Sequence, residues 1–202
     1  MQRIGLTGGI ASGKSAVAAM LRDLGFRVLE ADAVSHNLME PGLPAYDEII
    51  REFGTELLGA DGRIDRAKLA SIVFAAPKKL AKLNTILHPR VEGMILRQFE
   101  EWRQNGVRDA VFVEAALLVE AGMTKNLDGL VVVRCKPEQQ VERLRARGIN
   151  EIEAKRRISA QLPLEEKLKH ATVSIDCSGT VEETRAQVDA LAAKLRHGSP
   201  TG

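Results

Sequence analysis

A glycine-rich segment near the N-terminus has the residue types and the spacing of a phosphate-binding loop. Gly8, four further residues, Gly13, Lys14 and Ser15 follow the pattern G-x-x-x-x-G-K-[ST] without a gap. Glycines let backbone N–H groups converge on phosphate oxygens, and the helix that follows adds the positive end of its dipole. Lys14 can neutralise the β and γ phosphates, and the Ser15 hydroxyl can ligate Mg²⁺. The segment therefore predicts a nucleoside triphosphate site rather than a glycine turn that binds nothing.

An aspartate and two arginines could turn phosphate binding into phosphoryl transfer. Asp32 follows a short apolar run, and in a parallel sheet that position lies at the carboxyl edge, where ligands bind. A carboxylate there can accept the proton of a hydroxyl that attacks the γ phosphate; the alternative is a helix N-cap. Arg143 and Arg147 are four residues apart, so we expect one helix face to direct both toward the transferring phosphate. The alternative for them is a solvated basic helix.

Other classes of nucleotide-binding protein lack support in this sequence. A GTPase of this loop type would carry an N-K-x-D-like guanine reader, and "TKNLD" at 124–128 does not match it. A motor or transporter ATPase would carry an apolar strand ending in paired acids, whereas "VFVEA" at 111–115 ends in one glutamate. The two cysteines, Cys135 and Cys177, lie far apart and outside any C-x-x-C spacing, which argues against a zinc site or a disulfide framework. We expect two buried thiols.

Short apolar runs predict the strands that must position these residues. The runs are continuous rather than alternating, which is typical of parallel strands covered on both faces. The expected strands cover residues 3–7, 27–30, 109–114, 129–134 and 172–176. Between the first two runs, apolar residues at helical spacing predict a helix that ends at Gly25. The strand, loop, helix, strand order predicts an α/β fold with a parallel five-stranded sheet flanked by helices.

Two stretches interrupt the predicted sheet. Residues 33–107 hold no convincing strand and predict a helical insertion, with helices at 44–53, 65–74, 77–87 and 89–105. His88 and Pro89 mark the expected boundary between the last two helices, because proline suits a first helical turn. Residues 143–170 are rich in arginine and lysine and predict a mobile lid. The remaining segments, 1–32, 108–142 and 171–197, form the expected core of a single domain, whose last helix begins with a capping box at Thr180 and Glu183.

The amino-acid composition limits the classes of partner that this protein is expected to bind. The chain has 202 residues, of which 45% are hydrophobic, enough for one substantial core. A balance of 29 Lys and Arg against 27 Asp and Glu leaves a formal charge of +2, and aromatic residues make up only 3%. Neither a cationic nor a base-stacking nucleic-acid surface is expected. The sequence shows no signal peptide or membrane span, so we expect a cytoplasmic protein. It does not define an oligomeric state.

The motifs together resemble the dephospho-CoA kinase family over roughly residues 2–195. They occur in one order along the chain: Gly8–Ser15, Asp32, His88–Pro89, Leu117–Glu120, Arg143–Arg147 and "QLPLEEKLKHA" at 161–171. The resemblance implies a P-loop fold and ATP-dependent phosphorylation of the ribose 3′-hydroxyl of dephospho-CoA, the last step of coenzyme A synthesis, with Mg²⁺ as metal. It implies that 33–107 binds the acceptor and that the arginines lie on the lid.

The resemblance also implies a role for each matching residue. Asp32 would take the acceptor proton, and Lys14, Arg143 and Arg147 would stabilise the transferring phosphate. His88, Leu117 and Glu120 would lie toward the acceptor. The ATP-binding positions would be Gly8, Gly9, Ala11, Ser12, Gly13, Lys14, Ser15 and Ala16, with Ser15 on the metal.

Five positions depart from the usual family pattern, and two other functions stay open. The departures are Ala11 for glycine, Ala16 for threonine, Glu30 for aspartate, Ala116 for proline and Cys177 for asparagine. None removes a residue expected to carry the chemistry. The alternatives are a P-loop kinase of another small hydroxylated metabolite and a nucleotide-dependent regulatory binding protein.

Overall fold

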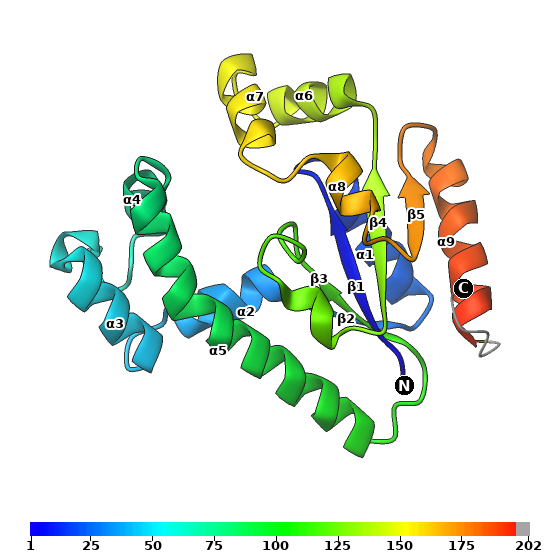
Figure 1. The fold of residues 1–202 in the computed structure, drawn as a ribbon, viewed down its shortest axis with the longest axis horizontal. Helices are drawn as coiled ribbons and strands as arrows, with labels where there is room; N and C mark the ends of the chain where they lie inside the picture. The colour runs from blue at the N-terminus through cyan, green and yellow to red at the C-terminus, as the bar shows by residue number, and fades with distance from the viewer. Residues whose placement is uncertain (197–202) are drawn as a thin grey trace. The chain divides into compact units, whose positions relative to one another are not determined.

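Five parallel strands form one sheet in the computed structural model, which describes residues 1–196. The strands are β1 (Arg3–Gly8), β2 (Arg27–Glu30), β3 (Val111–Glu114), β4 (Gly129–Arg134) and β5 (Val173–Asp176). Their order across the sheet is β2-β3-β1-β4-β5 (Figure 1). The predicted α/β fold and all five predicted strands are confirmed.

The strand register brings the phosphate-binding segment to the middle of one sheet edge. Leu6 of β1 pairs with Glu114 of β3, and Gly8 pairs with Val133 of β4. Glu30 at the end of β2 pairs with the same Glu114. Because all five strands are parallel, their carboxyl ends share this edge. The loop that follows β1 therefore begins beside the ends of both neighbouring strands.

Two helices cover one face of the sheet. The helices α1 (Lys14–Asp23) and α9 (Val181–Arg196) share an apolar core with β1, β4 and β5 (Figure 1). Phe26 and Phe112 pack edge to face in this core, with ring centroids 5.6 Å apart. The predicted capping box is confirmed, because the Thr180 N–H donates to the Glu183 carboxylate and the Glu183 N–H donates to the Thr180 hydroxyl.

The chain divides into two units. The sheet unit comprises Met1–Glu30 and the chain from Glu101 onward, and the helical unit comprises Ala31–Glu100. The helical unit contains α2 (Ala31–Leu38), α3 (Pro44–Phe53), the short 3-10 helix η1 (Thr55–Leu57), α4 (Arg66–Phe74) and most of α5 (Pro77–Gln104). It has an apolar core of its own, in which Ile49, Leu57 and Val73 are among the most buried residues. Asp65 caps α4 by accepting the N–H groups of Ala67 and Lys68.

The predicted break at His88 and Pro89 is wrong, because α5 continues through both residues. A proline inside a helix removes one backbone hydrogen bond and crowds the preceding turn. Buried side chains on either side, among them Leu87 and Val91, lie along the same helix face and favour one continuous helix. The Arg90 guanidinium also donates to the Ile86 carbonyl at 2.6 Å, which adds a polar contact in the turn interrupted by the proline.

Three helices follow β4 within the sheet unit. They are α6 (Pro137–Ala146), α7 (Glu151–Ser159) and α8 (Leu164–Leu168), and a 3-10 helix, η2 (Met123–Asn126), precedes β4.

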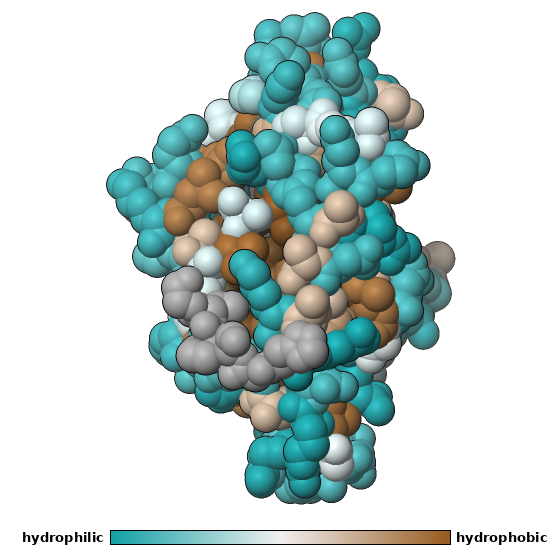
Figure 2. Space-filling model, turned by 90° about the vertical axis from the view of Figure 1, so that its right-hand side faces the viewer, coloured by the Kyte–Doolittle hydropathy of each residue, from teal (hydrophilic) through white to brown (hydrophobic). Residues whose placement is uncertain are grey.

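The face drawn in Figure 2 is covered mainly by hydrophilic side chains. Within residues 1–196, no helix has the length and the apolar character needed to cross a membrane.

Candidate functional site

The loop between β1 and α1 begins and ends at glycines whose positions leave no room for a side chain. A Cβ atom on Gly8 would lie 2.4 Å from the Val133 carbonyl oxygen, so no side chain fits there. Gly13 has a φ of 106°, and a Cβ on it would lie 2.9 Å from the Cys177 sulfur. Lys14 then begins α1, which directs the free N–H groups of the first helical turn into the loop. This is the geometry of an anion site at a helix N-terminus.

Ala11 adopts a left-handed conformation in the middle of this loop. Its φ is 59°, and it is the one non-glycine residue of the described chain with a positive φ. Alanine is strained there, whereas glycine is not. The Ala11 carbonyl accepts a hydrogen bond from the Arg143 guanidinium at 3.1 Å and a weak one from the Cys135 thiol at 3.9 Å. These partners hold the strained conformation in place.

Lys14 and Ser15 converge on a buried carboxylate that was not among the predicted site residues. Lys14 Nζ lies 2.5 Å from Glu114 Oε1, and the Ser15 hydroxyl donates to the same oxygen at 3.3 Å. The Glu114 side chain is only 7% exposed. Arg22 pairs with Glu30 at 2.6 Å and lies 3.9 Å from Glu114. The sequence signal for Glu114 was an apolar strand that ends in a single acid.

The loop has the donor set that a Mg²⁺-nucleotide requires. Mg²⁺ in such sites takes one or two protein oxygens, and substrate phosphates and water supply the rest. Ser15 and Glu114 offer a hydroxyl and a carboxylate side by side. Among the described residues, no group of three His, Cys, Asp or Glu side chains is placed to hold a metal by itself. The Ser12 hydroxyl is buried and has no hydrogen-bond partner in the described chain, which fits a loop shaped for polar ligand atoms.

The segment after β4 holds the loop through side chains that sequence reasoning mostly missed. The Gln140 side-chain amide donates to the Ile10 carbonyl at 2.7 Å, and the Ile10 N–H donates to Gln161 at 2.8 Å. Besides Ala11, Arg143 donates to the Cys177 carbonyl at 2.8 Å. A glutamine carries no charge or motif signal by which a site residue is usually recognised. These contacts fix both the conformation of the loop and the direction of the Arg143 side chain.

Arg147 differs from Arg143 in its position. The helix α6 ends at Ala146, and Arg147 is its exposed C-terminal cap residue. The two arginines therefore do not form a pair within one regular helix, because Arg147 lies just beyond the last helical residue. Arg143 points back to the phosphate loop, whereas Arg147 extends from the end of the helix into solvent.

The two cysteines are buried, as expected, next to the phosphate loop. Each follows directly after one of two neighbouring strands, Cys135 after β4 and Cys177 after β5. Burial raises the pKa of both thiols, and the nearby Arg143 charge partly opposes this. Neither thiol is therefore poised as a nucleophile at neutral pH.

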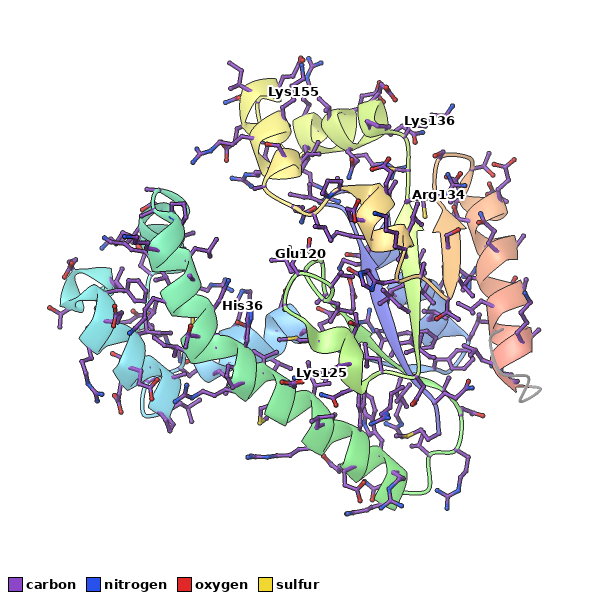
Figure 3. All side chains as sticks on the ribbon, in the orientation of Figure 1. His36, Glu120, Lys125, Arg134, Lys136 and Lys155 are labelled. Atoms are coloured by element: carbon purple, nitrogen blue, oxygen red, sulfur yellow. The ribbon has the colours of Figure 1, made fainter. Side chains whose placement is uncertain are left out.

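Glu120 takes part in a buried polar cluster instead of standing free. Its carboxylate accepts hydrogen bonds from Lys167 Nζ at 2.8 Å and from the Leu162 N–H at 3.0 Å. Lys167 is 1% exposed and also donates to the Ala116 carbonyl at 2.6 Å, which the Thr7 hydroxyl contacts at 3.2 Å. Figure 3 shows Glu120 on the loop after β3. Leu117, on the same loop, is 45% exposed.

Asp32 and His88 belong to the helical unit. Asp32 is exposed in the first turn of α2, two residues after β2 ends, and is not the N-cap that the alternative interpretation gave. One turn later is His36, labelled in Figure 3, which lies 2.7 Å from the Arg66 guanidinium. Partial burial, then the Arg66 charge, lowers the pKa of His36, and Asp32 opposes both. Burial also lowers the pKa of the half-buried His88, and Glu92 opposes it.

Comparison with known proteins identifies close relatives. The family model described as dephospho-CoA kinase matches residues 2–183. A dephospho-CoA kinase of Carboxydothermus hydrogenoformans is 47% identical over 194 residues, covering 96% of this chain and 94% of the relative. The crystal structure of TT1252 from Thermus thermophilus has a TM-score of 0.82 and 36% identity, with 96% and 97% of the two chains covered. A dephospho-CoA kinase from Campylobacter jejuni has a TM-score of 0.73 and 28% identity, with 97% and 98% covered.

Proposed function

Since the chain belongs to the dephospho-CoA kinase family, we propose that it transfers the γ-phosphoryl group of ATP to the ribose 3′-hydroxyl of dephospho-CoA. The products are coenzyme A and ADP, and the reaction is the final step of coenzyme A synthesis. The observation that carries this function is the loop from Gly8 to Ser15, with Lys14 and Ser15 directed at the buried carboxylate of Glu114. The near-complete overlap with relatives of that name supports the choice of acceptor.

ATP binds through the loop in this proposal. Backbone N–H groups of residues 8–16 and the N-terminus of α1 contact the phosphate oxygens, and Lys14 neutralises their charge. Ser15 and Glu114 would hold Mg²⁺, which when bound neutralises part of the charge on the ATP phosphates. Lys14 Nζ lies 2.5 Å from the Glu114 carboxylate. In the ATP complex, this carboxylate and the phosphates therefore compete for the same ammonium group.

Asp32 is the proposed acceptor of the ribose proton. As the 3′-oxygen attacks the γ phosphorus, its proton passes to the Asp32 carboxylate and the bond to the ADP oxygen breaks. Asp32 is exposed at the start of α2, so its carboxylate is available for a ligand. Lys14 and Arg143 stabilise the negative charge of the γ oxygens, and Arg147, exposed at the end of α6, joins them when the lid closes.

The remaining predictions concern the binding of the acceptor and the closure of the lid. We propose that residues 33–107 bind the acceptor, with His88 and the exposed Leu117 as contacts. Glu120 acts by fixing the loop that carries Leu117, because Lys167 and the Leu162 N–H occupy its carboxylate. Residues 143–170 form the lid, whose closure excludes water and so limits ATP hydrolysis.

An acceptor assay tests the function. The protein is incubated with ATP, Mg²⁺ and dephospho-CoA, and the product is analysed by mass spectrometry and by phosphorus NMR to locate the new phosphate. A 3′-phosphate on the ribose is expected, with one ADP formed per coenzyme A. Transfer only to another hydroxylated metabolite would show that the protein is a kinase with a different acceptor. Nucleotide-controlled binding of a partner without transfer to any acceptor would overturn the proposed activity.

A further inference from the structure

Two glutamines from outside the phosphate loop bond both backbone polar groups of one loop residue. The Gln140 side-chain amide donates to the Ile10 carbonyl at 2.7 Å, and the Gln161 side-chain oxygen accepts the Ile10 N–H at 2.8 Å. Gln140 lies directly against the loop, because a Cβ atom on Gly9 would approach its amide nitrogen to 2.5 Å. We call this pair, Gln140 and Gln161, the Ile10 clamp.

The two glutamines lie close to the two ends of the proposed lid, residues 143–170. Gln140 is in α6, three residues before the lid begins, and Gln161 follows α7 and precedes α8. The chain leaves the sheet after β4, passes through α6 and α7, and returns toward the sheet at α8 (Figure 1). In the described chain the ion pairs of α7 are formed within that helix. The part of the lid between the two glutamines therefore has both of its ends bonded to the same residue of the phosphate loop.

The residue after Ile10 is the one whose conformation needs support. Ala11 has a φ of 59°, a left-handed conformation that disfavours a non-glycine residue by about tenfold. The Ile10 carbonyl belongs to the peptide plane before Ala11, and the Ala11 carbonyl belongs to the plane after it. Gln140 bonds the first carbonyl, and Arg143 bonds the second at 3.1 Å. Because the orientation of these two planes defines the φ and ψ of Ala11, the contacts hold its conformation directly.

We propose that Gln140 and Gln161 are positioning residues for ATP, which keep the phosphate loop in its binding conformation and couple that conformation to the lid. The inference rests on the nucleotide part of the proposed function and not on the identity of the acceptor. A displacement of either end of the lid weakens a contact with Ile10 and so favours relaxation of Ala11. By linkage, phosphates bound in the loop stabilise both ends of the lid in return.

The two contacts differ in the direction of the hydrogen bond, which provides a matched pair of variants. Gln140→Glu replaces the donor by a carboxylate that faces a carbonyl oxygen, so this hydrogen bond is lost. Gln161→Glu keeps an acceptor for the Ile10 N–H and makes the bond charge-assisted. Both substitutions add one negative charge beside the same loop residue. The difference between them therefore reports the direction of the hydrogen bond and not the added charge.

The test is calorimetric titration of the full chain with ATP and Mg²⁺ in the absence of an acceptor. Gln140→Glu and the uncharged Gln140→Met should each raise the Kd for ATP about tenfold, the effect of one lost hydrogen bond with its partner left unpaired. Gln161→Glu should raise it several-fold less, because its hydrogen bond is kept. With dephospho-CoA present, the same variants should raise the KM for ATP and leave the KM for dephospho-CoA unchanged.

Two further measurements separate positioning from a merely structural role. Adding Ala11→Gly to Gln140→Met should recover most of the lost ATP affinity, because glycine adopts the left-handed conformation without strain. Hydrogen exchange reports the coupling to the lid. Saturating ATP should slow exchange in residues 144–160 of the wild type and should slow it less in Gln140→Met.

The outcomes distinguish this inference from the proposed function. If the wild type binds ATP but phosphorylates no dephospho-CoA, the acceptor is wrong, and the ATP titrations still test the clamp. Equal weakening by Gln140→Glu and Gln161→Glu, no recovery with Ala11→Gly, or equal protection of the lid in Gln140→Met would each overturn the clamp and leave the kinase in place. Thermal melting identifies any variant that does not fold; if Gln140→Glu is one, Gln140→Met takes its place in the comparison.

Discussion

The buried Lys167 provides the sharpest stability prediction. Lys167→Met keeps the apolar stem but removes the ammonium that joins the Ala116 carbonyl, at 2.6 Å, to Glu120, at 2.8 Å. Removing one partner of a buried ion pair typically costs about 3–5 kcal/mol, because the other charge stays behind unpaired. Glu120 is 22% exposed and keeps the Leu162 N–H, so water relieves part of this cost. We expect a loss of about 3 kcal/mol in the free energy of unfolding.

Equilibrium unfolding in urea and thermal melting measure this loss. For a chain of this length, about 3 kcal/mol corresponds to a fall in Tm of about 6–12 °C. The matched control is Lys169→Met, two residues further on, where an exposed lysine pairs with Glu166 on the surface. A surface pair of that kind contributes about 0–1 kcal/mol.

A double mutant separates the pair from the rest of the cluster. Adding Glu120→Gln to Lys167→Met removes the stranded charge, so the double mutant should lose less than the sum of the two single losses. A loss below about 1 kcal/mol for Lys167→Met, or equal losses for Lys167→Met and Lys169→Met, would refute the view that this buried pair holds the loop after β3.

Three further predictions concern the site and its surroundings. Asp32→Asn should reduce kcat by about 10²- to 10⁴-fold with ATP affinity unchanged, the usual contribution of a general base. Asp47→Asn, which also alters the first turn of a helix, should leave kcat intact; equal effects of the two would remove Asp32 from the chemistry. Ala11→Gly should leave Tm unchanged or raise it, because glycine relieves the left-handed strain at φ 59°. By contrast Ala16→Gly, inside α1, should cost about 1 kcal/mol, and a similar loss at both positions would contradict the strain argument. His88 has a lowered pKa in the folded protein, so the unfolded chain binds its proton more tightly and stability should fall as the pH drops below about 6.5. His36 shares this dependence, because its pKa is also lowered, so His88→Gln should reduce the slope of unfolding free energy against pH in that range without removing it. An unchanged slope would show that other groups cause it.

The phosphate loop and the sheet were predictable because their signals are local. The motif from Gly8 to Ser15 is contiguous, and the continuous apolar runs mark each strand independently of its neighbours. The capping box of Thr180 and Glu183 likewise spans only four residues. In the phosphate loop and the capping box the interacting groups are close in sequence, and each strand is marked by its own residues, so residue type and spacing are sufficient to predict these elements.

The continuity of α5 depends on tertiary packing, which local sequence rules do not describe. Pro89 predicts a helix boundary from its own backbone chemistry. Residues on both sides of it, among them Leu87 and Val91, are buried along one helix face, and a break would interrupt that face. Tertiary burial therefore outweighed the loss of one backbone hydrogen bond.

The partners of the site residues were decided by the tertiary structure alone. Lys14 meets Glu114 because β1 and β3 are neighbours in a register that pairs Leu6 with Glu114. Glu120 meets Lys167, and Arg143 meets the Ala11 carbonyl, across similarly long stretches of chain. The sequence determined which residue types were available for phosphoryl transfer and that a P-loop carries them. Which of them touch was set by strand order, register and burial, because contacts between distant segments exist only once the whole sheet has formed.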